Sequence, residues 1–208
     1  MRRTFTIVLA LAGLLALACA KRNVIEVPPR VDLREFGAIG IIQFESESKG
    51  NLPELATRRF IEALQESQPG VRVLELGPAS EIEGLPDSGR IDHRAVKQIG
   101  GTYEVDAIVV GDLIVKDVHP RVDLMQTITT MSVSADVDAG LTARLLETGR
   151  GATVWTRSSS AMRTVAHVGM SGKTVRFDAQ DPQQAYGELV DALVYDITYD
   201  FRPSYVRE

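Results

Sequence analysis

The feature that most constrains the fold is a strict alternation of apolar and polar residues in the second half of the chain. Apolar residues occupy every second position from Val133 to Leu145, with polar residues or glycine between them. Successive side chains of a β-strand point to opposite faces, so this pattern predicts one long strand with one covered and one solvent-exposed face. A turn at 148–151 follows, and Val154 with Trp155 begins a returning strand. We therefore expect a hairpin.

The first half of the chain alternates strand-like and helix-like segments. Short apolar runs predict buried strands at 38–44, 71–76 and 105–115, and helical spacing fills the two gaps between them. This order favours right-handed crossovers and a largely parallel sheet. The expected fold class is therefore α/β, with a two-layer or three-layer sheet and flanking helices. The sheet would be parallel in its first half and carry the long antiparallel hairpin in its second.

Three helices are expected from their start and stop signals. The first is capped by Asn51, with Glu54 closing a capping box. The second begins near Asp92 and ends at the glycine pair Gly100-Gly101. The third begins at Asp181, which is followed by a proline at the first helical position and a capping-box glutamine.

The amino terminus has the parts of an export signal. A positively charged start is followed by an apolar stretch of 12 residues, Ile7 to Ala18, broken only by Gly13. This stretch is shorter than the roughly 20 residues that span a bilayer. Cys19 comes directly after a small residue, and this junction resembles the lipobox of bacterial lipoproteins. The resemblance implies a thiol carrying diacylglycerol and a new amino group acylated, for example with palmitate. Two alternatives stay open: an ordinary secretory signal cut after Ala18 or Ala20, and a twin-arginine signal at Arg2-Arg3.

These observations divide the chain into three parts. Residues 1–18 are expected to be a lipoprotein signal peptide, 19–34 a lipid-anchored extended tether, and 35–208 a single periplasmic α/β domain. The expected location is the outer membrane, facing the periplasm, because Ala20 replaces the aspartate of an inner-membrane retention signal. The inner membrane stays possible.

Charge and cysteine content exclude several partners and cofactors. Without the signal peptide the chain has 21 basic and 28 acidic residues, which gives no electrostatic attraction for nucleic acid. Cys19 is the only cysteine, so neither an intramolecular disulfide nor a cysteine metal site is possible. We expect contact with the membrane through acyl chains on Cys19, and no cofactor.

Three local patterns together resemble one superfamily of envelope proteins. They are the strand 39–44 leading through a polar loop into 55–64, the segment 98–111, and the segment 141–155 with its glycine turn. Their order is similar to that of the superfamily containing the curli secretion channel lipoprotein (CsgG), the TolB amino-terminal domain and lipoprotein activators of penicillin-binding proteins. The first pattern departs from it at Gln43, where members often have proline. The resemblance implies a periplasmic α/β domain that binds other proteins or itself.

Catalytic and metal-binding constellations are absent from the sequence. His93, His119 and His167 lie on unrelated segments and have no ligand-spaced neighbours. Asp136 and Asp138 share the polar face of the long strand, where two carboxylates alone would hold a cation weakly. The segment 172–174 matches the end of a phosphate-binding loop without its first glycine or the following helix. We therefore expect a protein that is not an enzyme and holds no metal.

Aromatic residues gather in the carboxy-terminal segment. Tyr199, Phe201 and Tyr205 either pack on the chain's own sheet or contact a partner, together with the exposed edge near the hairpin. The expected function is that of a lipid-anchored accessory or assembly protein acting by protein–protein contacts, with an unknown envelope partner or by self-association. The first alternative is a subunit of an oligomeric envelope export channel, with 118–131 and 158–175 as membrane-crossing hairpins. A hydrolase is the remote alternative.

Overall fold

The computed structural model describes residues 24–83, 85, 91–121, 134–171 and 174–207. Residues Pro29–Arg202 form the main compact unit, and the two ends of the chain form a second one. The main unit contains a six-stranded sheet in the order β5-β2-β6-β7-β8, with β3 also paired to β6. Its strands are β2 (Ile39–Ile42), β3 (Glu45–Ser46), β5 (Val73–Gly77), β6 (Ala107–Arg121), β7 (Ser134–Glu147) and β8 (Ala152–Ala166).

The sheet has the two halves that the sequence predicts. Strand β2 pairs in parallel with both β5 and β6, whereas β7 pairs antiparallel with β6 and with β8. Along β7 every second residue from Ala135 to Leu145 is buried, and the residues between them are half-buried. The α/β class, the parallel first half and the long hairpin are confirmed. The hairpin turns through Gly151, whose φ of 70° suits a residue without a side chain.

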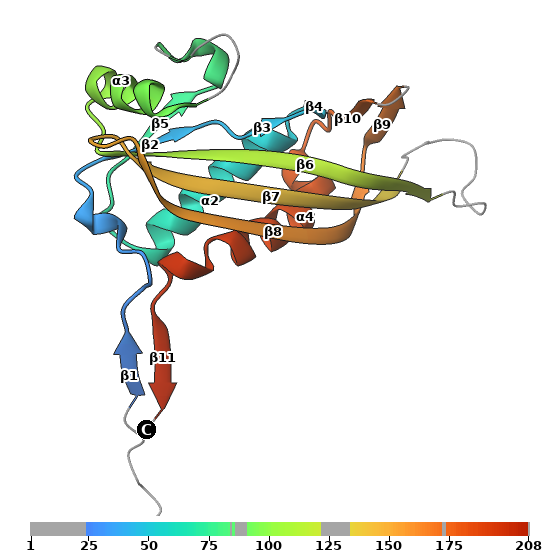
Figure 1. The fold of residues 1–208 in the computed structure, drawn as a ribbon. Helices are drawn as coiled ribbons and strands as arrows, with labels where there is room; N and C mark the ends of the chain where they lie inside the picture. Colours follow the sequence, from blue (N-terminus) through green and yellow to red (C-terminus); the bar gives the residue numbers. More distant parts are fainter. Residues whose placement is uncertain (1–23, 84, 86–90, 122–133, 172–173, 208) are drawn as a thin grey trace, which may run out of the picture. The chain divides into compact units, whose positions relative to one another are not determined.

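Helices cover the two faces of the sheet unequally (Figure 1). Helices α2 (Leu52–Ser67) and α4 (Pro182–Ile197) pack with one face in the larger hydrophobic core, which includes Phe60, Leu141 and Leu193. Helix α3 (His93–Tyr103) packs on the other face in a smaller core at the parallel end, with Val96 and Ile108. The sheet is therefore three-layered at one end, and its long strands extend beyond α3.

Two predicted helix signals have other roles in the structure. The Asn51 side chain does not cap α2, and its Nδ2 instead donates to the carbonyl oxygen of Ala179 at 3.0 Å. Helix α3 does not end at Gly100 but continues to Tyr103. A Cβ atom on Gly100 would lie 2.4 Å from Cβ of Thr148, so this glycine allows the helix to approach the sheet. The predicted cap Asp181 does accept a hydrogen bond from the backbone N–H of Gln184 at 3.0 Å.

The segment after the hairpin forms a smaller sheet. The chain leaves β8 at Ala166, and His167 adopts a φ of 56° before the next strand begins. Strands β9 and β10 then pair antiparallel with each other, and β10 pairs in parallel with β4. Their bounds are β4 (Lys49–Gly50), β9 (Val168–Ser171) and β10 (Thr174–Phe177). The glycines in this segment obscured the register at the sequence level.

The unit made by the chain ends is a two-stranded antiparallel ribbon of β1 (Val24–Val27) and β11 (Ser204–Arg207). Four of the residues expected in the tether are therefore paired with the end of the chain. Leu33, in a 3₁₀ turn over Leu33–Glu35, is fully buried in the larger core. The expected signal peptide 1–18 and Cys19 lie outside the described residues.

Candidate partner-binding surface

Strand β8 forms one of the two edges of the main sheet. Strand β8 is 15 residues long and pairs with β7, and in the described residues no other strand pairs with it. It contains no proline, and most side chains on the face away from α4 are exposed hydroxyl or apolar groups. Such an edge is a template for adding a further strand. Its position was inferred from the sequence, where it was expected as the exposed edge near the hairpin.

The sheet face that lies opposite α2 and α4 is open beyond α3. Residues directly opposite each other in paired strands share a face. The cross-strand rows on this face are Asp112 with Thr142 and Ser158, then Ile114 with Gly140 and Ser160, then Asp138 with Met162. Ile114 and Met162 are 59% and 54% exposed. Helices α2 and α4 lie behind these strands in Figure 1. The face is therefore a polar surface with two exposed apolar side chains.

A shallow hollow of about 360 Å³ lies on this open face. Gly140 has no side chain to fill it, and Lys116 from β6 borders it. The Lys116 Nζ lies 3.8 Å from a carboxylate oxygen of Asp138, and the hydroxyls of Thr142 and Ser158 are 2.8 Å apart.

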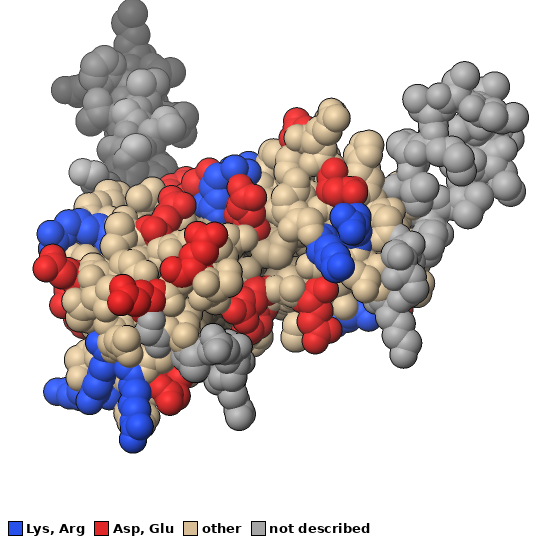
Figure 2. Space-filling model, turned by 90° about the horizontal axis from the view of Figure 1, so that it is seen from above, with Lys and Arg blue, Asp and Glu red and all other residues tan. Residues whose placement is uncertain are grey.

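A larger crevice of about 900 Å³ adjoins the hollow, with Ile114 and Thr142 lining both. It lies at the carboxyl end of β2. From there the chain runs through α2 to β5, which pairs with β2 on one side, and then through α3 to β6, which pairs with β2 on the other side. Ligands of α/β sheets bind at such switch points. Three carboxylates line it, those of Glu45, Glu47 and Asp112, and its lining includes neither lysine nor arginine. Figure 2 shows acidic side chains spread widely over the face seen from above.

An aromatic patch lies at the end of α4, where Tyr195 and Tyr199 are 68% and 55% exposed. The guanidinium carbon of Arg202 lies 4.1 Å from the ring centroid of Tyr195, and that of Arg157 lies 5.3 Å from the ring of Tyr199. These cation–π contacts restrict the rings while leaving them accessible. Tyrosine and arginine are enriched at the centres of protein interfaces. Because Arg157 belongs to β8, the aromatic patch continues the β8 edge.

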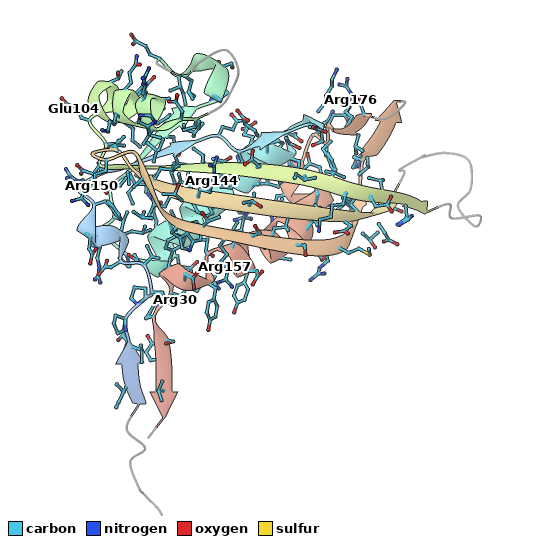
Figure 3. All side chains as sticks on the ribbon, viewed as in Figure 1. Arg30, Glu104, Arg144, Arg150, Arg157 and Arg176 are labelled. Carbon is cyan, nitrogen blue, oxygen red and sulfur yellow. The ribbon has the colours of Figure 1, made fainter. Side chains whose placement is uncertain are left out.

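A buried carboxylate holds the aromatic patch in place. Asp200, in the 3₁₀ turn Tyr199–Phe201, accepts hydrogen bonds from Trp155 Nε1 and Arg157 Nη1, both at 3.1 Å, and from Arg30 Nη1 at 3.3 Å. The side chains of Arg30 and Arg157 approach the same end of α4 (Figure 3). Burial acts to raise the pKa of Asp200, but these donors and the two guanidinium charges outweigh it. The pKa therefore lies below its ordinary value of 3.8.

The three aromatic residues expected to contact a partner occupy different environments. Tyr199 is exposed in the aromatic patch, whereas Phe201 is fully buried, with its ring centroid 4.6 Å from that of Trp155 and 6.3 Å from that of Phe60. The side chain of Phe201 is therefore part of the core and not of a contact surface. Tyr205 is 64% exposed and belongs to the ribbon formed by the chain ends. Sequence composition alone could not separate these three cases.

The residues considered for chemistry are dispersed. His93 begins α3, His119 is in β6, and His167 follows β8. Asp136 accepts a hydrogen bond from Thr164 Oγ1 at 2.6 Å. Among the described residues, no group of three or more His, Cys, Asp and Glu side chains could hold a metal ion.

The segments considered as membrane-crossing hairpins are divided between several elements. Residues 118–121 and 158–166 pair with β7 within the main sheet, as parts of β6 and β8. Residues 122–131 and 172–173 lie outside the described part of the chain. In the part that is described, no helix is long and apolar enough to cross a membrane.

The chain is similar in structure to several solved proteins, at low sequence identity. No protein-family model and no curated protein matches the sequence. The chain is similar to a solved dodecamer of PelC from Paraburkholderia phytofirmans, at 11% identity and a TM-score of 0.48, over 87% of this chain and 97% of that one. It is also similar to lipoprotein GNA1162 from Neisseria meningitidis, at 18% identity and a TM-score of 0.37, over 61% and 83%. The carboxy-terminal domain of LpoB from Salmonella enterica matches at 12% identity and a TM-score of 0.38, over 61% and 83%. One of these three solved structures is that of a bacterial lipoprotein.

Proposed function

We propose that the chain is a lipid-anchored accessory or assembly protein of the bacterial envelope, which acts by binding another protein along β8. The anchor would be acyl chains on Cys19, which follows an export signal ending at Ala18. The domain would face the periplasm from the outer membrane. The observation that carries the proposal is the outer edge of β8, with which no strand pairs among the described residues, and which is bordered by the open sheet face and the aromatic patch.

The β8 edge and the aromatic patch supply different parts of a protein contact. A partner strand added to the β8 edge would gain main-chain hydrogen bonds, which provide affinity with little dependence on sequence. Exposed Tyr195 and Tyr199 would supply rigid aromatic anchors, which lose little conformational freedom on binding because arginines already restrict them. Together these features favour a macromolecular partner over a small ligand.

Site-specific photo-crosslinking in native envelopes tests the contact. A crosslinking amino acid at Met162 on β8 should capture a defined partner or a second copy, whereas one at the exposed Gln98 on α3 should not. Lysines at Ser158 and Ser160, both exposed, should abolish capture from Met162, because charges on an edge strand oppose strand addition. Undiminished capture after Ser158→Lys and Ser160→Lys would exclude the β8 edge as the contact.

The anchor and the assembly state need separate measurements. Cys19→Ser should release the chain from the membrane fraction and remove the acyl mass from the amino-terminal peptide. Light scattering of the acylated protein after size exclusion in mild detergent gives the number of subunits. Retention of the Cys19→Ser chain in membranes would contradict anchoring through this cysteine. A monomer that forms no crosslink in native envelopes would contradict the proposed contact function.

A further inference from the structure

The ribbon formed by β1 and β11 carries an unpartnered apolar face. Ile25 lies opposite Val206, and Val27 lies on the same face two residues further along β1. These three side chains are 45%, 52% and 38% exposed, respectively. A two-stranded ribbon is only marginally stable in water on its own. Among the described residues of this unit, no further helix or strand covers the apolar face. Something that removes this face from water would stabilise the ribbon.

We propose that this face contacts the lipid surface of the membrane that holds the protein. The inference rests on the acylation of Cys19 proposed above. Four residues separate Cys19 from Val24, so five backbone steps span at most about 18 Å. An acylated cysteine lies at the headgroup level, and each headgroup layer is roughly 5–8 Å thick. The ribbon therefore cannot lie far from the membrane surface.

Charge around the ribbon fits an anionic surface. Residues 20–30 and 202–208 contain five basic and two acidic residues, whereas residues 31–201 contain 16 basic and 26 acidic ones. Basic residues near a membrane are attracted to anionic headgroups, and the acidic remainder of the chain is repelled. The opposite face of the ribbon carries Glu26 and Tyr205, which pair with each other and would point away from the membrane.

A tryptophan placed in the ribbon reports on lipid contact. Val27→Trp, which places the probe on the apolar face beside Ile25 and Val206, is introduced into the full acylated protein. The protein is reconstituted in phosphatidylethanolamine and phosphatidylglycerol vesicles carrying bromine at shallow acyl positions. Trp155 is the only native tryptophan, and its burial makes the parent protein the reference for quenching. Bromine should quench the added fluorescence of Val27→Trp and leave the parent unaffected. Replacing phosphatidylglycerol with phosphatidylcholine should reduce the quenching.

Variants of the apolar face decide whether that face makes the contact. Adding Ile25→Ser and Val206→Ser should remove the quenching of Val27→Trp. The matched control is Leu74→Ser, which removes a similarly exposed apolar group from β5 at the other edge of the main sheet and should leave the quenching unchanged.

Mass analysis of the amino-terminal peptide separates the two ways in which the inference could fail. An acylated chain without quenching would overturn the ribbon contact alone. A blue-shifted but unquenched tryptophan would do the same, because protein and not lipid would cover it. A chain without acyl mass would overturn both the anchor and the ribbon contact.

Discussion

The adjacent glycines of α3 should respond in opposite directions to the same substitution. Both Gly100 and Gly101 lie within the helix. A Cβ atom on Gly100 would lie 2.4 Å from Cβ of Thr148, whereas a Cβ atom on Gly101 would meet nothing within 4 Å. Thr148 cannot easily withdraw, because its Oγ1 donates to the carbonyl of Val105 at 2.7 Å and its N–H to that of Asp106 at 2.9 Å. Gly100→Ala should therefore destabilise the protein and Gly101→Ala should stabilise it.

The difference between the two variants isolates the steric cost. Replacing glycine by alanine within a helix gains about 1 kcal/mol at either position. Inserting a methyl group into a packed contact costs about 1–3 kcal/mol, and the short distance to Thr148 places Gly100→Ala near the upper value. The helix gain cancels in the comparison, so Gly100→Ala should be about 3 kcal/mol less stable than Gly101→Ala.

Urea unfolding followed by Trp155 fluorescence measures this difference. With a slope of about 2 kcal/mol per molar urea, the two midpoints should differ by roughly 1.5 M. The parent protein should unfold between them. Equal midpoints for the two variants would refute the close approach of α3 to Thr148, and with it the steric requirement for glycine at position 100.

Two further predictions concern the carboxy-terminal segment. Phe201→Ala should lower the free energy of unfolding by about 3–5 kcal/mol, because it removes a fully buried ring. Tyr199→Ala should lower it by about 0.5–1 kcal/mol, the value of an exposed cation–π contact; similar urea midpoints for these two variants would contradict the core role of Phe201. Asp200→Asn should cost about 1–3 kcal/mol at pH 7, because it weakens buried charge-assisted hydrogen bonds. The folded state lowers the pKa of Asp200, so its contribution is present above the unfolded value of 3.8 and is lost as the pH falls below it. Urea midpoints measured from pH 7 to pH 3 should therefore fall less for Asp200→Asn than for the parent, and parallel curves would contradict this.

Local patterns predicted the framework of the fold but not the roles of individual residues. The alternation from Val133 to Leu145 predicted β7, because a strand places successive side chains on opposite faces whatever its partners are. Asp181 was a reliable signal for the start of a helix, because its side chain accepts a hydrogen bond from a backbone N–H only three residues further along the chain. Asn51 had the same local signal, but its side-chain amide donates a hydrogen bond to the carbonyl oxygen of Ala179, which is distant in sequence.

The candidate surface could be predicted only in part. An exposed edge near the hairpin was expected from the sequence, and the returning strand β8 does lie at an edge of the main sheet. Burial of Phe201 beside exposed Tyr199 did not follow, because it depends on where the turn after α4 meets Trp155. The hollow around Gly140 did not follow either, because it depends on the register in which three strands, β6, β7 and β8, pair with one another.

The sequence by itself determined the α/β class, the parallel and antiparallel halves of the sheet, and the expected anchor at Cys19. These rest on periodicity and short motifs, in which the interacting groups are close along the chain. Only the tertiary structure decided the pairing of Val24–Val27 with Ser204–Arg207, the open face of β6–β8 and the contact of Gly100 with Thr148. Each of these joins residues far apart in sequence, and it is the packing of the whole chain that brings them together.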